Sequence, residues 1–256
     1  MSRTKGRFPL RRAAALCAAL LAATTASAET SAPAAGYAVE WIENGEAVPA
    51  TREDIEQRLS QPWLDGFEVR AATAGKDEPP VTLASCRDYL GVADRQVEPH
   101  RATSSDRAIF QARALDCQAL VLVRDAQPAA VSHLRGLVFD DTLPDHLPWQ
   151  VALIISGADA ARIGAERPRA TWREALFEPL TEFSSCGPHC GRYGDPAAVQ
   201  SVWLVARGDF DGDGIEDMLL SSDDAVTGGS YRASRLLLLT RRTPDGRVEL
   251  IRELEH

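Results

Sequence analysis

A short acidic segment near the C-terminus constrains the fold of this chain more than any other feature. Apolar runs flank it on both sides, SVWLVAR at 201–207 and DMLLSS at 217–222, and both runs are typical of strands. The sequence therefore predicts two antiparallel strands joined by a tightly wound acidic loop. Four aspartates and two glycines make up most of that loop: Asp209, Asp211, Asp213, Asp217, Gly212 and Gly214.

The spacing of these residues favours a calcium site. Calcium is a hard ion that takes six to eight oxygen ligands, and side chains at every second position of a wound loop converge on one point. Glycine permits the positive-φ turns that such winding needs. Together with Glu216, five carboxylates lie within nine residues, so their repulsion couples local folding to a bound cation. The predicted ligands are Asp209, Asp211, Asp213, the backbone carbonyl of Ile215, and Asp217.

Two other interpretations of the loop were weighed. An EF-hand ends its loop with a bidentate glutamate at the twelfth position and lies between helices, whereas position twelve here is Leu220 and the flanks read as strands. The second alternative is an Asp-Gly-rich hairpin turn without a metal, since both residues are common turn formers. The prediction is a strand–loop–strand calcium site, with the metal-free turn left as the alternative.

The segment ARGDFDGDGIEDMLL at 206–220 resembles the calcium-loop core of FG-GAP/VCBS-type repeats, as in integrin-like propellers. The resemblance covers under a tenth of the chain. It implies that Asp209, Asp211, Asp213 and Asp217 bind calcium together with the carbonyl of Ile215. Propellers of that kind need several copies of the repeat, and this sequence has one, so the resemblance extends to the loop and not to the propeller.

The N-terminus has the pattern of a secretory signal peptide. Five basic residues precede an apolar run at 13–23, and Ala26-Ser27-Ala28 is a small-residue cleavage site, so we expect cleavage after Ala28. The apolar run is shorter than the roughly 20 residues of a membrane span. An uncleaved anchor and a lipidated Cys17 are the alternatives. Residues 29–36 are expected to form a flexible tether, and the protein to be periplasmic or secreted.

Charge narrows the range of partners. Removal of the signal peptide, with five basic residues and no acidic one, takes the formal net charge from −9 to −14. Such an acidic surface repels phosphate backbones, so no nucleic-acid partner is expected. No later apolar stretch is long enough to span a membrane after signal cleavage.

Four cysteines remain after the signal: Cys86, Cys117, Cys186 and Cys190. An even number in an oxidising compartment predicts two disulfides, and three pairings are possible. Proximity in sequence favours Cys86–Cys117 and Cys186–Cys190. The second pair was also considered as a thiol–disulfide centre or, with His189, as a zinc site. Its three intervening residues and the turn-forming segment at 191–196 favour a structural disulfide.

The remaining patterns predict a single α+β domain over residues 37–256, with a possible sub-boundary near 184–198. Helices and strands mix in its N-terminal and middle parts, and the C-terminal part is an antiparallel meander that carries the acidic loop. Segment 81–90 is left as strand or helix, and so is 171–183, where Glu174, Glu178 and Glu182 suggest a solvated helix face. The expected helices are 51–59 and 104–123, and the expected strands are 37–42, 66–73, 151–156, 201–207, 217–221, 235–241 and 248–251.

No reaction is identified by the sequence, which lacks both a Gly-x-Ser-x-Gly motif and a phosphate-binding loop. We therefore expect a non-enzymatic, calcium-stabilised envelope protein of binding or structural type, with a protein or glycan partner. The alternatives are a metal-dependent hydrolase and a periplasmic thiol–disulfide helper using Cys186 and Cys190.

Overall fold

The computed structural model describes residues 36–254, with the exception of positions 74, 76–77 and 177. The predicted signal peptide at 1–28 lies outside the described residues, as does the predicted tether apart from Gly36. Helices are combined with antiparallel sheets, so the α+β class expected from the sequence is confirmed. Within the described part of the chain, no helix has both the length and the apolar character needed to cross a bilayer.

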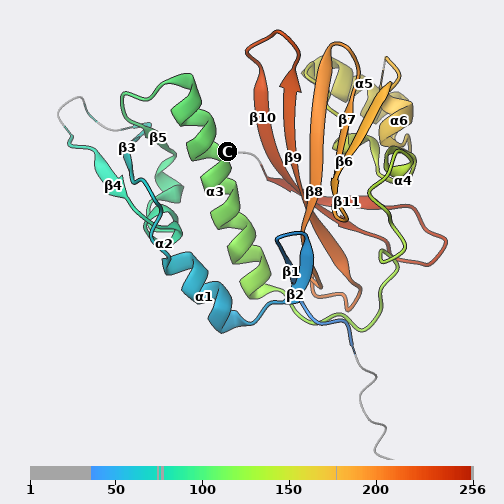
Figure 1. Cartoon of the computed structure of the whole chain (residues 1–256), viewed down its shortest axis with the longest axis horizontal. Coiled ribbons are helices and arrows are strands. Elements are labelled where there is room, and N and C mark those ends of the chain that lie inside the picture. The colour runs from blue at the N-terminus through green and yellow to red at the C-terminus, as the bar shows by residue number, and fades with distance from the viewer. Residues whose placement is uncertain (1–35, 74, 76–77, 177, 255–256) are drawn as a thin grey trace, which may run out of the picture. The chain divides into compact units, whose positions relative to one another are not determined.

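A central antiparallel sheet of eight strands organises the fold (Figure 1). Its main path runs β11–β10–β9–β8–β1–β2, and β8 also pairs with β7, which pairs with β6. The 11-residue β8 pairs with β7 along its first part and with β1 near its end. The strands are Glu40–Glu43 (β1), Glu46–Pro49 (β2), Glu182–Gly187 (β6), Cys190–Gly194 (β7), Ala198–Gly208 (β8), Asp217–Val226 (β9), Arg232–Thr240 (β10) and Glu249–Leu254 (β11).

Both faces of this sheet are buried, which explains the unbroken leucine run of β10. Leu236 and Leu238 belong to a hydrophobic cluster on one face, whereas Leu237 and Leu239 belong to a second cluster on the other. Successive side chains of a strand point to opposite faces, so a strand covered on both sides needs apolar residues at every position. The expected C-terminal meander is present as β8 to β11.

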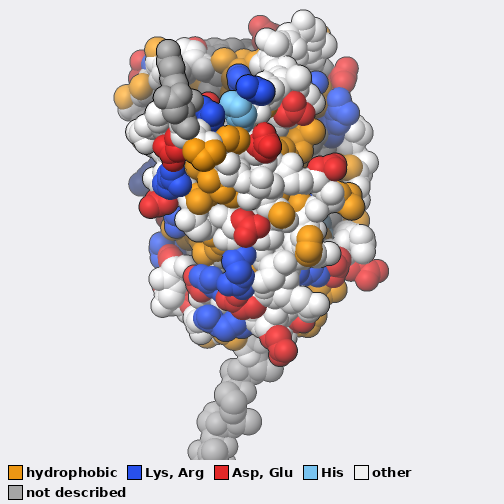
Figure 2. Space-filling view, turned by 90° about the vertical axis from the view of Figure 1, so that its left-hand side faces the viewer, with side chains coloured by type: hydrophobic (Ala, Val, Ile, Leu, Met, Phe, Trp, Pro, Cys, Tyr) orange, Lys and Arg blue, Asp and Glu red, His pale blue; other side chains and the backbone are white. Residues whose placement is uncertain are grey.

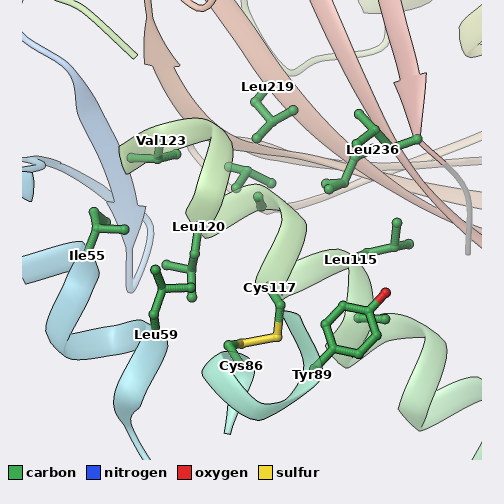
Figure 3. Close-up of a cluster of buried hydrophobic side chains, with 14 of the residues drawn as sticks. Ile55, Leu59, Cys86, Tyr89, Leu115, Cys117, Leu120, Val123, Leu219 and Leu236 are labelled. Carbon is green, nitrogen blue, oxygen red and sulfur yellow. A yellow bond between two sulfur atoms is a disulfide. The ribbon is translucent and has the colours of Figure 1, made fainter. Parts of the chain in front are cut away.

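The first layer is built on a long helix, α3, that packs between the sheet and the smaller elements of the N-terminal part (Figures 1 and 3). Thr103 and Asp106 form a capping box that starts α3. Thr51 accepts a hydrogen bond from the backbone N–H of Asp54 and so starts α1 as predicted. The elements are α1 (Arg52–Ser60), β3 (Phe67–Ala71), β4 (Val81–Leu83), α2 (Cys86–Leu90), η1 (Ala93–Arg95), β5 (Val97–Pro99) and α3 (Ser104–Asp125), with the small sheet in the order β4–β3–β5.

The outer surface of this layer carries acidic and basic side chains interspersed with one another (Figure 2). Several of them form ion pairs between neighbouring elements. Arg87 of α2 lies 2.7 Å from Glu56 of α1, and Arg95 lies 2.8 Å from Glu78. Exposed pairs of this kind contribute little to stability, about 0 to 1 kcal/mol each.

The two disulfides join the cysteines that the sequence pairs by proximity. Cys86–Cys117 links the start of α2 to the middle of α3, within the core of the first layer (Figure 3). Cys186–Cys190 closes the turn between β6 and β7. Residues 184–198, considered as a sub-boundary, form most of this hairpin and enter the central sheet.

The second layer covers the opposite face of the sheet with short helices (Figure 1). Trp172 is fully buried there, with its ring 4.8 Å from that of Tyr193 on β7. The Tyr193 hydroxyl donates a hydrogen bond to the carbonyl of Asp140 at 2.8 Å, which ties the layer to the sheet. Burial raises the pKa of Tyr193, so the phenol stays protonated. The elements are α4 (Leu143–His146), η2 (Trp149–Val151), α5 (Gly157–Glu166) and α6 (Trp172–Ala175).

The predicted strand at 151–156 is wrong. Residue 151 ends η2, and Ser156 is the N-cap of α5. The backbone carbonyls of this stretch bind side chains instead of a neighbouring strand: Gln200 donates to Val151, and Arg235 donates to Val151 and Ala152. An apolar run alone does not reveal that its hydrogen-bond partners are distant side chains.

Two further predictions need correction. Segment 171–183 is neither one strand nor one helix, because α6 ends at Ala175 and β6 begins at Glu182, so Glu174 and Glu182 share no helix face. The turn expected at 191–196 is largely β7, which pairs with β8 on one side and β6 on the other. Glycine signals a turn locally, but this strand is set by long-range pairing. Segment 81–90 contains both a strand, β4, and a helix, α2.

Candidate metal centre

The acidic loop connects β8, which ends at Gly208, to β9, which begins at Asp217. Gly212 and Gly214 both have φ of 82°, as the predicted winding requires. No neighbouring atom lies within 4 Å of a Cβ placed at either glycine, so backbone conformation and not crowding selects glycine here. The strands fix the two ends of the loop, since Gly208 and Asp217 are directly paired.

Three carboxylates of the loop converge. Asp209, Asp211 and Asp217 each offer one oxygen, and these oxygens all lie within 4.8 Å of one another. Asp209 and Asp217 are buried and Asp211 is exposed, so the group opens toward solvent on one side. This acidic group can hold a metal ion, with hard oxygen donors of the kind that bind divalent cations.

Backbone N–H groups of the loop orient these carboxylates. Gly212 N–H donates to Asp209 Oδ1 at 2.7 Å, and Gly214 N–H donates to Asp209 Oδ2 at 2.9 Å. Phe210 N–H donates to Asp217 Oδ2 at 3.0 Å. Each carboxylate oxygen has two lone pairs, so one such bond fixes the oxygen and leaves it able to bind a cation.

Asp217 is the most unusual member of the group. Its side chain is fully buried, and Oδ1 has no hydrogen-bond partner of normal geometry among the described residues. Burial raises the pKa of Asp217 to about 6; the nearby Thr240 and the Phe210 N–H oppose this rise, and Asp211 and Asp213 add to it. A buried carboxylate with an unmatched oxygen is costly unless a cation or a proton compensates it.

Asp213 and Ile215 differ from the other predicted ligands. Asp213 is not part of the convergent group. Its Oδ1 accepts from Ile215 N–H at 2.8 Å, and its Oδ2 lies 2.5 Å from Arg242 NH1. The carbonyl of Ile215 accepts none of the hydrogen bonds found among the described residues, which leaves it available as a ligand.

Sequence reasoning missed the cation beside the loop, Arg242. It follows β10, and its NH2 lies 3.5 Å from Asp211 Oδ2, while NH1 contacts Asp213. Half of the Arg242 side chain is exposed, so these ion pairs lie at the solvent side of the loop. The guanidinium partly neutralises two of the aspartates. A separation of 29 residues leaves no local signal for this contact.

Glu216 faces away from the convergent group. Its fully buried carboxylate lies 2.5 Å from Arg135 NH2 and accepts from Ser132 Oγ at 2.5 Å, with Arg207 NH1 at 3.7 Å. The sequence predicts that Glu216 is one of five mutually repelling carboxylates, but in the structure two arginines compensate its charge. Asp217 is the next residue, and successive side chains of an extended segment point to opposite sides. Glu216 and Asp217 therefore anchor the end of the loop on opposite sides of the chain.

The segment after α3 holds the loop from outside. Gln127 and Asp209 exchange two backbone hydrogen bonds of 2.8 Å, and Ala130 N–H donates to the carbonyl of Gly214 at 2.8 Å. Glu216 N–H donates to the carbonyl of Val131 at 2.7 Å. The loop backbone is therefore bound to a chain segment about 80 residues earlier in the sequence.

No known relative helps to interpret this site. No family model matches the chain, and searches of the curated proteins and of the solved structures return no significant match. The likeness of the loop to FG-GAP/VCBS-type repeats therefore remains an untested prediction.

Neither the thiol–disulfide centre nor the zinc site that Cys186 and Cys190 could form has a free thiolate. Cys186 and Cys190 are bonded to each other, so neither sulfur is available as a zinc ligand beside His189. The pair lies in a β hairpin and not at a helix N-terminus, the position that lowers a thiol pKa in redox motifs.

Proposed function

We propose that this chain is an exported protein that binds one calcium ion in the 209–217 loop and serves as a binding or structural component of the cell envelope. Calcium stabilises the fold in this account and takes no part in a reaction. The partner is a protein or a glycan. The N-terminal signal pattern and the two disulfides support export to an oxidising compartment.

The convergence of three carboxylate oxygens within 4.8 Å of one another, two of them on buried residues, carries the proposal. An acidic turn without a metal would have its carboxylates exposed or fully hydrogen-bonded. Here one oxygen of the buried Asp217 carboxylate lies within 4.8 Å of oxygens from two others, and burial raises the pKa of Asp217. A divalent ion at the centre of the group would compensate both the burial and the repulsion.

Calcium fits the donor set better than other common metals. All donors are oxygens, which argues against zinc and copper, and the flexible geometry of calcium suits a loop of unequal ligands. Magnesium demands a near-ideal octahedron and retains water. An exported protein also meets calcium levels that fill weak sites.

Titration calorimetry with calcium tests the proposal on the mature chain after treatment with chelator. We expect one site per chain, and weaker binding of magnesium. Replacement of Asp211 by Ala abolishes binding, while Arg242→Ala strengthens it severalfold because a competing cation is removed. Asp65→Ala, at an exposed position outside the loop, is the matched control and leaves binding unchanged.

The catalytic alternatives give different results in the same material. A metal-dependent hydrolase would turn over a substrate and lose that activity in chelator. A thiol–disulfide helper would exchange Cys186–Cys190 with a dithiol substrate. Absence of calcium binding by the wild-type chain at millimolar concentrations would overturn the proposal.

A further inference from the structure

A groove of about 780 Å³ lies on the second layer, and none of the predicted calcium ligands lines it. Its walls come from the segment that joins α4 to η2, from the loop at 168–171 that precedes α6, and from the connection between β10 and β11. The volume lies within the usual range for small-molecule sites, about 300 to 1,000 Å³.

Three arginines line this groove: Arg169, Arg241 and Arg247. Within the described part of the chain, none of them lies at ion-pair distance from a carboxylate. Arg241 NH1 donates to the carbonyl of His133 at 3.1 Å, and Arg247 NH1 donates to the carbonyl of Arg169. Neutral carbonyls hold these two guanidinium groups in place without compensating their charge.

Three carboxylates also line the groove, Asp145, Asp245 and Glu249, and two of them contact arginines outside the lining. Arg173 forms an ion pair with Asp145, with its Nε 2.6 Å from Asp145 Oδ1. Arg242 Nε lies 3.9 Å from Glu249 Oε2. Asp245 is the lining carboxylate that no described cation contacts. Three guanidinium groups without an ion-pair partner among the described residues therefore line one groove of a chain whose formal net charge is −9.

Two residues of the groove lining each have an unmatched polar atom. Gln150 Oε1, an acceptor, and Arg241 Nε, a donor, are buried without a hydrogen-bond partner, and both residues line the groove. Both atoms are closed off from solvent, so a ligand in the groove would contact the exposed polar atoms of the lining and not these two. His146 adds a further polar side chain, and Leu147 and Val248 supply apolar surface.

We propose that this groove binds a small organic oxyanion, a sugar-sized molecule that carries a carboxylate or a phosphate. The planar guanidinium fork matches both groups with paired, charge-assisted hydrogen bonds. Arg169 and Arg247 contact the anion, and Gln150 and His146 contact neutral hydroxyl groups of the same ligand. The inference is independent of calcium binding, since no predicted calcium ligand lines the groove.

Three ligands with one ring test the proposal on the mature, calcium-loaded chain: glucose 6-phosphate, glucuronate and glucose. We expect calorimetry to detect one or both anions, and to detect at least tenfold weaker binding of glucose. The phosphate and carboxylate arms identify which oxyanion the groove prefers. Binding of neither anion at 10 mM, or equal binding of glucose, would overturn the proposal.

Variants locate the binding to the groove. Arg169→Gln is expected to weaken anion binding about tenfold without affecting folding, because its side chain has no polar partner among the described residues. Asp245→Asn removes the uncompensated carboxylate and is expected to strengthen binding severalfold. Arg232→Gln, another exposed arginine far from the groove lining, is the control. Anion binding that survives the combined Arg169→Gln and Arg247→Gln changes would place the ligand elsewhere and refute the assignment.

Discussion

Single residues of the acidic loop divide into those that face one another and those that face the rest of the protein. The spacing of the acidic residues predicts that Asp209, Asp211 and Asp217 converge, and the structure brings these three carboxylates together. The same spacing also included Asp213, which instead pairs with Arg242. Such a contact is not predictable from the loop, because its partner lies on a different strand connection.

Replacement of Asp217 by Asn tests the cost of its buried charge. The amide keeps the shape and can still accept from Phe210 N–H, but it carries no charge. We expect the metal-free protein to gain about 1 to 3 kcal/mol of unfolding free energy at pH 7, because the pKa of Asp217 is raised by about two units. The same variant should lose its response to calcium. Chemical denaturation in chelator and in calcium measures both effects, and a destabilised metal-free variant would contradict the argument.

His189 predicts a pH dependence of stability. Burial and the neighbouring Arg207 lower the pKa of His189, against a smaller opposing effect of Glu40. The folded state therefore favours the neutral imidazole, and this contribution to stability is complete above the unfolded pKa of about 6.5. As the pH falls below that value, the unfolded chain takes up the proton more readily and the contribution is lost.

Denaturation at pH 7 and pH 5 checks this expectation. The wild-type chain should lose more stability over this interval than His189→Gln. A His133→Gln variant is the control for the loss of a histidine as such, and should follow the wild type. If His189→Gln and the wild type lose equal stability, the partly buried imidazole of His189 is not responsible.

At the scale of whole elements, strands covered on both faces were predictable, and connections were not. The leucines at 236–239 of β10 are unambiguous because hydrophobic clusters cover both faces of the sheet there. The segment at 151–156 is equally apolar, yet Arg235 and Gln200 bind its carbonyls from distant strands. Short-range pattern therefore predicts β8 to β11 and the helices α1 and α3, whereas β7 and the connections of the second layer depend on long-range pairing and side-chain hydrogen bonds.

The disulfide between α2 and α3 should contribute most of the covalent stabilisation. Cys86 and Cys117 are separated by 31 residues, and the chain-entropy model gives a loop of this length about 3 to 4 kcal/mol. We expect the Cys86→Ala, Cys117→Ala double variant to lose about that much unfolding free energy. The disulfide removed in the Cys186→Ala, Cys190→Ala double variant spans a separation of only four residues. This variant should therefore lose clearly less unfolding free energy. Equal losses in the two variants would contradict the assignment.

The whole molecule places the acidic loop where its two layers are connected. The chain leaves α3 of the first layer at Asp125, binds the loop through Gln127 and Ala130, and then enters the second layer at α4. Arg135 and Glu216 reinforce this crossing with an ion pair in which the Glu216 carboxylate is fully buried. An ion in the loop would therefore stabilise the sheet and both layers together, and should raise the stability of the entire fold.

Thermal unfolding of the mature chain tests this account most directly. With free calcium at a hundredfold excess over the dissociation constant, mass action adds about 2.7 kcal/mol, which corresponds to a rise of about 5 to 10 °C in a domain of this size. The account predicts this rise relative to chelator in the wild type, and its absence in the Asp211→Ala, Asp213→Ala double variant. Identical melting of the wild-type chain in chelator and in millimolar calcium would contradict it.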